Sequence, residues 1–349
     1  MEEYISDNSL YIRSKNNSMI NRKMIGRVLG MLLFIELGMF LLCAGVSAGY
    51  GESDYKYFLY TCIINAVVGG LLLLYGRGAE NKMSRRDGYC VVTLSWVFFT
   101  FFGMLPFYFS GSIDTITNAF FETMSGFTTT GATILDDIES LSHGMLFWRS
   151  LTQWIGGLGI AILPIFTTGG VQLFSAESTG VTHDRTHPKI NVMAKWLWTI
   201  YLVLTVSETV LLMFGGMSLF DAICQSFATT ATGGYSTKQN SISYWNSPYI
   251  EYVVAIFMIV SSINFSLFLM CLKGKVGRLF KDEELHWFLA SVGILTFLIT
   301  LALVFQNHYD WELAFRKALF QVSTVHTSCG FATDDYNMWP PFTWLLLFI

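Results

Sequence analysis

The sequence predicts an all-α, polytopic membrane protein in which membrane spans alternate with pore loops. The first observation is composition, because hydrophobic residues make up 53% of the chain and charged residues only 13%. A soluble domain carries about 25% charged residues. The second is a series of long uncharged runs, and the third is a glycine-containing apolar segment that recurs three times. The 30 Phe and 10 Trp also exclude a solvated, disordered chain.

Seven apolar runs are long enough to cross a bilayer, which takes about 20 helical residues. A further run opens at Trp339 and reaches Ile349, which is too short for a crossing. The sequence therefore predicts seven complete spans and one incomplete span. The seven cover residues 28–51, 57–76, 88–113, 150–176, 196–220, 252–272 and 287–307.

Basic residues predict the orientation of these spans. Sixteen of the 21 Lys and Arg gather in the N-terminal tail and in the loops after spans two, four and six. Such loops stay in the cytoplasm, so we expect a cytoplasmic N-terminus. The opposite loops are acidic, either to attract cations or because bases are kept inside. The net charge of −4 gives no support for a nucleic-acid partner.

Three of the predicted outer connections each contain an apolar stretch of about 10 to 14 residues, a length typical of a re-entrant segment. Each is preceded by a full span, and a further apolar run follows it. The unit of span, half-span, glycine turn and span therefore recurs about every hundred residues. The segments read ITNAFFETMSGFTTTGAT (116–133), LFDAICQSFATTATGGYST (219–237) and FRKALFQVSTVHTSCGFAT (315–333).

Aligning the segments on Gly131, Gly234 and Gly330 brings other positions into register. Alanine stands twelve residues before each glycine, Glu or Gln nine before, and a hydroxyl-bearing residue two before. Gly233 could replace Gly234 as the second anchor. We prefer Gly234 because residues 234–237, Gly-Tyr-Ser-Thr, then match Gly-Phe-Ala-Thr at 330–333.

Such a turn can bind cations through its backbone. A half-helix that ends in Thr-Thr-Gly leaves carbonyls without helical partners, and several such turns around one axis can replace the hydration shell of an ion. Irregular backbone at membrane depth needs protein or water around it. Ordinary capping would explain one segment, whereas three matching copies favour a pore. The candidate carbonyls belong to Thr129, Thr130, Gly131, Thr232, Gly233, Gly234, Ser328, Cys329 and Gly330.

Four motifs carry a family resemblance: FTTTGAT (127–133), FWRSLTQWIGGLGI (147–160), ATGGYST (231–237) and TSCGFAT (327–333). On these motifs the chain resembles the Trk/Ktr/HKT superfamily of potassium transporters, specifically the Trk-type membrane subunit. Two spans precede the first repeat, which is similar to the Trk branch. Ser-Cys-Gly replaces the more usual Thr-Thr-Gly in the third segment, with little expected effect, because backbone carbonyls bind the ion.

The resemblance implies four repeats around one pore, of which three are present, so we expect a truncated protein that does not conduct selectively alone. It implies K⁺ as the transported ion, with no covalent cofactor, no other metal and no catalytic residue. It also implies a homodimer in the cytoplasmic (inner) membrane and a cytosolic nucleotide-binding regulatory subunit docked on residues 170–195 and 273–281. The expected parts are 1–87 (tail and two extra spans), 88–190 (repeat 1), 191–280 (repeat 2) and 281–349 (repeat 3, incomplete).

Other functions stay open at this stage. A sodium-permeable or sodium-coupled member of the superfamily is one, although a serine in place of Gly131 accompanies sodium preference in plant relatives. A membrane-embedded enzyme would need a carboxylate, His or Lys/Arg cluster near one interface, and the sequence offers none. A non-transporting assembly component would not need a repeated filter. We also expect Glu122 to pair with Arg149 and so to fix the first pore helix.

Overall fold

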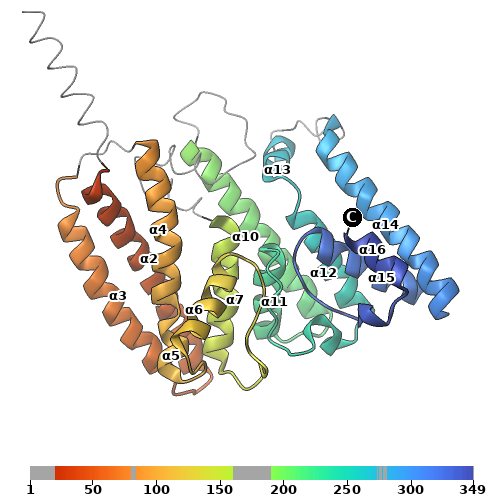
Figure 1. Cartoon of the computed structure of the whole chain (residues 1–349), viewed down its shortest axis with the longest axis horizontal. Coiled ribbons are helices and arrows are strands. Elements are labelled where there is room, and N and C mark those ends of the chain that lie inside the picture. Colours follow the sequence, from red (N-terminus) through yellow and green to blue (C-terminus); the bar gives the residue numbers. More distant parts are fainter. Residues whose placement is uncertain are drawn as a thin grey trace, which may run out of the picture.

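A computed structural model describes residues 20–79, 84–159, 190–272 and 281–348, together with Gly274 and Gly277. Within these residues the regular structure is entirely helical, which confirms the all-α membrane fold (Figure 1). The α-helices are α2 (Arg22–Gly49), α3 (Tyr55–Tyr75), α4 (Arg85–Gly103), α5 (Leu105–Ser110), α6 (Ile116–Phe127), α7 (His143–Leu158), α10 (Ile190–Phe214), α11 (Leu219–Thr230), α12 (Pro248–Ser261), α13 (Phe265–Leu272), α14 (Glu283–Asn307), α15 (Trp311–His326) and α16 (Pro341–Phe348). Two 3₁₀ turns, η3 (Ser241–Trp245) and η5 (Tyr336–Met338), lie in the connections.

Five helical stretches in the described part of the chain are long and apolar enough to cross a membrane. They correspond to predicted spans one, two, three, five and seven. The fourth predicted span begins in α7, but residues 160–176 lie outside the described residues. The predicted short final run forms α16, a helix of 8 residues. The five stretches are Arg22–Gly49, Tyr55–Tyr75, Arg86–Ser110, Lys195–Phe214 and Glu283–Asn307.

The prediction of one continuous sixth span over 252–272 is wrong. α12 ends at Ser261, and α13 begins only at Phe265. Two of the three intervening residues, Ser262 and Asn264, are polar, and the Ser262 hydroxyl donates to the Met258 carbonyl at 3.0 Å. Serine and asparagine side chains compete for backbone groups in this way, so they weaken a helix at this point.

The third span bends for a different reason. α4 ends at Gly103, and Pro106 stands in the first turn of α5. Proline cannot donate the backbone hydrogen bond that would continue the helix, so the chain is redirected there. Trp148 of α7 donates its indole N–H to the Gly103 carbonyl at 2.9 Å. The bend is therefore connected to α7.

The first two helices form a closely packed antiparallel pair at one side of the molecule (Figure 1). A Cβ on Gly30 would lie 2.9 Å from the carbonyl oxygen of Gly69, so glycine allows the two backbones to approach. Between them Asn65 donates to the buried carboxylate of Glu36 at 3.0 Å. This contact supplies one polar partner to an acid at membrane depth.

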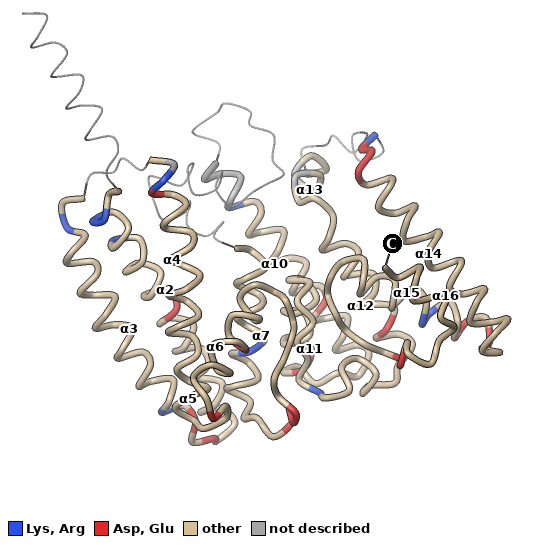
Figure 2. The backbone as a smooth tube through the Cα atoms, viewed as in Figure 1, with Lys and Arg blue, Asp and Glu red and all other residues tan. Residues whose placement is uncertain are grey.

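Charged residues are unequally distributed between the two ends of the helical bundle (Figure 2). Lys and Arg mark the beginnings of α2, α4 and α10, whereas acidic residues mark the opposite loops, including 51–54 and 136–139. The short helices α6 and α11 lie toward the acidic end (Figure 1). The predicted pore segments are therefore nearer to the acidic side.

Candidate ion filter

Three helices end at the three predicted filter segments: α6, α11 and α15. Each helix ends with the same two backbone hydrogen bonds. The amide of the residue two positions before the anchor glycine donates to the carbonyl three residues back. The amide of the following residue donates to the carbonyl five residues back. Such a pair satisfies the last carbonyls of a helix. The bonds are Thr129→Gly126 3.0 Å, Thr130→Ser125 2.9 Å, Thr232→Thr229 2.9 Å, Gly233→Ala228 2.8 Å, Ser328→Val325 3.0 Å and Cys329→Thr324 2.9 Å.

The residue at the left-handed position of this turn is normally glycine, but here it carries a side chain. Thr129, Thr232 and Ser328 have φ values of 54°, 51° and 57°. Left-handed backbone costs a non-glycine residue about 1–2 kcal/mol. The same strain at three matched positions indicates that the surrounding structure enforces the turn, which is typical of functional sites.

The anchor glycines also have positive φ, at 76° for Gly131, 77° for Gly234 and 91° for Gly330. Gly233 is absent from the positive-φ residues of the described chain, so the geometry favours Gly234 as the second anchor. In each segment, two residues with positive φ therefore lie on either side of one residue whose φ is not positive. Alternation of handedness aligns successive amides on one side, so their carbonyls face the other.

The three segments converge on one another. A Cβ on Gly131 would overlap the carbonyl oxygen of Gly233 and would lie 3.7 Å from that of Cys329. A Cβ on Gly234 would overlap the Cys329 carbonyl oxygen. Each of these glycines therefore lies against the residue that precedes the next anchor glycine. At Gly330 an added Cβ would meet no described atom within 4 Å.

Most of the predicted filter carbonyls accept no hydrogen bond from the part of the chain that the structure describes. Of the nine candidates, only the Gly233 oxygen accepts a hydrogen bond from the described residues, from the Gln153 amide at 2.6 Å. Backbone carbonyls at membrane depth need a partner, and these eight can find it in water or in a cation. The free carbonyls are those of Thr129, Thr130, Gly131, Thr232, Gly234, Ser328, Cys329 and Gly330.

Side chains of α7 hold the second segment in place. Gln153 both donates to the Gly233 carbonyl at 2.6 Å and accepts from the Tyr235 amide at 3.0 Å. Arg149 donates to the Ser236 carbonyl at 2.9 Å, and its guanidinium lies 3.6 Å from the centre of the Tyr235 ring. One helix of the first repeat therefore fixes the backbone of the second filter segment.

The predicted pairing of Glu122 with Arg149 is confirmed, with Nε and Oε1 2.7 Å apart in a fully buried environment. The Glu122 carboxylate also accepts from the Thr133 hydroxyl at 2.9 Å and from the Ile134 amide at 3.0 Å. It thus connects the first pore helix, the chain beyond the first filter glycine and α7. A buried pair of this kind costs about 3–5 kcal/mol to break by removing one partner.

Sequence reasoning missed Gln153 and Tyr235 as parts of the site. Gln153 stands in FWRSLTQWIGGLGI, which served only to indicate a family. An amide within an apolar helix must find buried partners, and that was the available signal. Its partners come from a segment about eighty residues away, so the sequence did not reveal them.

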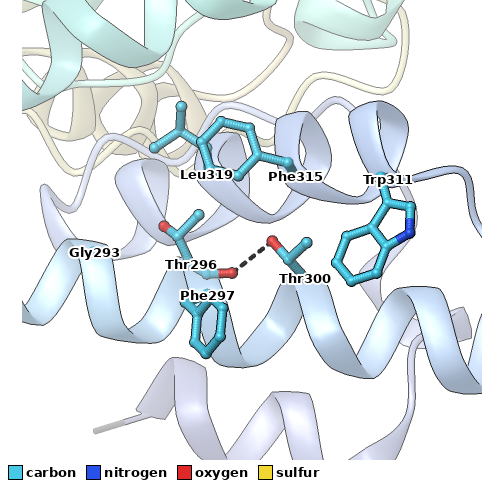
Figure 3. Close-up of a pocket in the computed structure, with 7 residues that line it drawn as sticks. All are labelled: Gly293, Thr296, Phe297, Thr300, Trp311, Phe315 and Leu319. Carbon is cyan, nitrogen blue, oxygen red and sulfur yellow. Dashed lines mark hydrogen bonds between the residues drawn. The ribbon is translucent and has the colours of Figure 1, made fainter.

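A separate cavity of about 340 Å³ lies between α14 and α15 (Figure 3). Its lining is apolar apart from two threonines, and the Thr300 hydroxyl donates to the Thr296 carbonyl at 2.7 Å. Its lining offers few oxygen atoms, so it cannot replace the hydration shell of a cation. The candidate conduction site is the set of converging filter segments. The lining residues are Gly293, Thr296, Phe297, Thr300, Trp311, Phe315 and Leu319.

Comparison with known proteins assigns the chain to a family. The family model TrkH, described as a cation transport protein, matches residues 55–349. The chain belongs to the TrkH family of cation transport proteins. It is therefore a multi-pass membrane protein of a transporter family and not an enzyme.

Individual relatives agree with this assignment. The Trk system potassium uptake protein TrkH of Salmonella typhimurium is 40% identical over 332 residues, covering 93% of this chain and 69% of the relative. TrkG of Escherichia coli K12 is 31% identical over 337 residues, covering 94% and 69%. The crystal structure of the potassium transporter TrkH from Vibrio parahaemolyticus matches with a TM-score of 0.84 and 32% identity, covering 93% and 68%.

Proposed function

We propose that this protein takes up potassium across the cytoplasmic membrane through a filter of backbone carbonyls. The carrying observation is that eight of the nine candidate carbonyls, from three matching turns, accept no hydrogen bond from the described residues. The relatives named as potassium uptake proteins support K⁺ as the ion. Gly131 supports potassium over sodium, because the family resemblance associates a serine at this position with sodium preference in plant relatives.

In this proposal the ion enters from the acidic end of the bundle. The pore helices α6, α11 and α15 direct their C-terminal, partly negative ends toward the filter. Carbonyl oxygens then replace the hydration shell of the ion as it passes. No bond is made or broken, and no covalent cofactor is required.

We infer that a fourth matching segment completes the ring against Gly330. Gly131 and Gly234 each lie against a carbonyl of the next segment, whereas a Cβ added to Gly330 would meet no described atom within 4 Å. The repeat boundaries proposed are 88–190, 191–280 and 281–349, after 1–87. Potassium uptake by the 349-residue chain and by the same chain extended through a fourth matching segment distinguishes three sectors from four, and selective uptake by the 349-residue chain contradicts the inference.

The test of function is ion uptake in a host that lacks its own potassium uptake systems. We expect the complete gene product to restore growth at low K⁺ and to take up K⁺ in preference to Na⁺. Equal uptake of both ions would favour the sodium-permeable alternative. Absence of uptake from a protein that reaches the membrane would refute the proposal.

The proposed orientation has a cytoplasmic N-terminus, supported by the basic end of the bundle. Cysteines introduced at Asn16 and Asp137 should react with impermeant reagents from opposite sides of the membrane. Asn16 lies outside the described residues. Labelling of both positions from the outside would reverse the assignment.

The proposed partners are a second copy and a cytosolic nucleotide-binding regulator of the Trk type. The docking candidates are the loops 170–195 and 273–281, most of which lie outside the described residues. Charge reversal of Lys273, Lys275 and Arg278 together should reduce co-purification of the regulator. Undiminished binding would leave these bases with a role in orientation only.

A further inference from the structure

A buried group of charges lies beside the third filter segment. On α15, Arg316 and Lys317 both pair with Glu251 of α12, at 2.8 Å and 3.0 Å. Arg316 also pairs with Glu312 at 2.9 Å. The side chain of Glu251 is only 1% exposed, whereas that of Glu312 is 58% exposed. The four charges therefore sum to zero, but only one of the acids is shielded from water.

Lys317 connects this group to the filter. Its ammonium donates to the carbonyl of Thr333, three residues beyond Gly330, at 2.8 Å. We term the three residues after each filter glycine the outer limb (132–134, 235–237 and 331–333). This segment must be held in place if the carbonyls before it are to keep their positions. In the third repeat a cation holds this limb.

The other two repeats hold their outer limbs without a cation on the pore helix. Glu122 of α6 accepts from Thr133 and Ile134. In α11, Gln225 donates to the Ser236 hydroxyl at 2.7 Å, and Asp221 accepts from Thr237 at 2.7 Å. All these contacts come from the pore helix of the same repeat.

The third repeat cannot use the same contacts. Ala332 stands where the other limbs have Thr133 and Ser236, so it has no hydroxyl to offer. The Oε1 atom of Gln321, the counterpart of Glu122, is buried without a hydrogen-bond partner among the described residues, as is that of Gln225. Lys317 stands at the position of Asp221 and reverses its charge. On the third limb the side-chain contact from the pore helix therefore comes from an ammonium group, in addition to backbone contacts of Ala332 with Ser241 and Ser243 at 3.2 Å each.

An ammonium beside a cation filter has an electrostatic cost. A unit charge near the path repels an entering cation, and the effect is larger where water does not screen it. Glu251 removes this cost, because it contacts both Lys317 and Arg316 from the neighbouring helix. It also fixes the direction in which the ammonium points, toward Thr333.

We propose that Glu251 is a positioning residue for the third filter segment, which aims Lys317 at the Thr333 carbonyl and neutralises it beside the ion path. This inference rests on the proposed function of potassium uptake. Glu251 itself does not contact the candidate filter carbonyls; it acts through Lys317.

The test measures K⁺ uptake kinetics of the complete gene product in vesicles at low ionic strength. Glu251→Gln leaves one excess positive charge, and we expect KM for K⁺ to rise about tenfold, with the difference shrinking as choline chloride is added. The double variant Glu251→Gln/Lys317→Met restores neutrality, so its KM should fall from that of Glu251→Gln toward the parent value, whereas its K⁺/Na⁺ discrimination should stay below that of the parent because the outer limb is released. Glu312→Gln is the matched control, because the same charge change at an exposed site is screened by water and should alter KM by less than about threefold.

An unchanged KM in Glu251→Gln, an equal rise in Glu312→Gln, or no recovery in the double variant would each overturn the inference. Should Glu251→Gln fail to reach the membrane, Lys317→Gln replaces it, since the Arg316–Glu251 pair remains. That variant should lower K⁺/Na⁺ discrimination by releasing the limb, and unchanged discrimination would overturn the inference. Absence of uptake by the parent protein would instead refute the proposed function.

Discussion

Replacing Gly131 with serine should weaken discrimination between K⁺ and Na⁺. Gly131 has φ 76°, and a Cβ there would overlap the carbonyl oxygen of Gly233. The left-handed backbone alone costs a side-chain-bearing residue about 1–2 kcal/mol. The Gly233 carbonyl, held by Gln153, must also move. If the displaced Gly233 carbonyl binds K⁺ about 1.4 kcal/mol less favourably relative to Na⁺, the K⁺/Na⁺ uptake ratio falls about tenfold, which is the change that we expect.

The assay compares uptake of both ions by the complete gene product at matched membrane levels. Gly111→Ser is the control, since Gly111 has a similar φ of 70°, but an added Cβ would meet nothing within 4 Å. It carries the backbone strain without the collision, so its ion ratio should equal that of the parent. A normal ratio in Gly131→Ser, with normal expression, would remove Gly131 from the filter and refute this reasoning.

Three further predictions concern the groups that support the filter. Gln153→Leu leaves the Gly233 carbonyl and the Tyr235 amide buried without partners, so the purified protein should lose about 2–6 kcal/mol of stability against thermal unfolding. An unchanged midpoint of thermal unfolding would contradict the role of Gln153 in holding the second segment. Arg149→Leu should destabilise by about 3–5 kcal/mol, and adding Glu122→Leu should recover part of this loss; a double variant less stable than the single one would argue against the pair. Burial tends to raise the pKa of Glu52, but hydrogen bonds from the backbone and ring of His143 and from the Gly144 amide outweigh it and lower the pKa of this loop carboxyl. Its stabilisation is therefore present above the unfolded pKa of about 4.3 and is lost as pH falls through the lower folded value, so the acid-induced fall in thermal midpoint should be smaller in Glu52→Gln.

Hydrophobic run length allowed most of the fold to be predicted from the sequence. Five of the predicted spans appear as helices of spanning length, because about 20 uncharged apolar residues have few stable alternatives in a bilayer. The sixth was wrong, since composition could not show that Ser262 would bond to the Met258 carbonyl and interrupt the helix. The length of an apolar run indicates burial in lipid, but it does not show where a side chain will hydrogen-bond to the backbone and interrupt the helix.

The candidate filter was also found from the sequence, through three aligned glycines. Repetition identified the positions of Gly131, Gly234 and Gly330, and all three have the positive φ that glycine favours. The pairing of Glu122 with Arg149 followed from the rule that intramembrane charges seek partners. These features depend on local backbone chemistry or on charge, and both are visible in a single sequence.

Only the tertiary structure decided how the segments support one another. Gln153 reaches Gly233, and Glu251 reaches Lys317, across separations that the spacing of motifs does not encode. Corresponding outer limbs are held by different groups, an acid after Gly131 and an ammonium after Gly330, so the alignment of the segments did not predict these contacts. Such contacts depend on which helices become neighbours and on where each buried polar group finds its partner, and packing of the whole chain determines both.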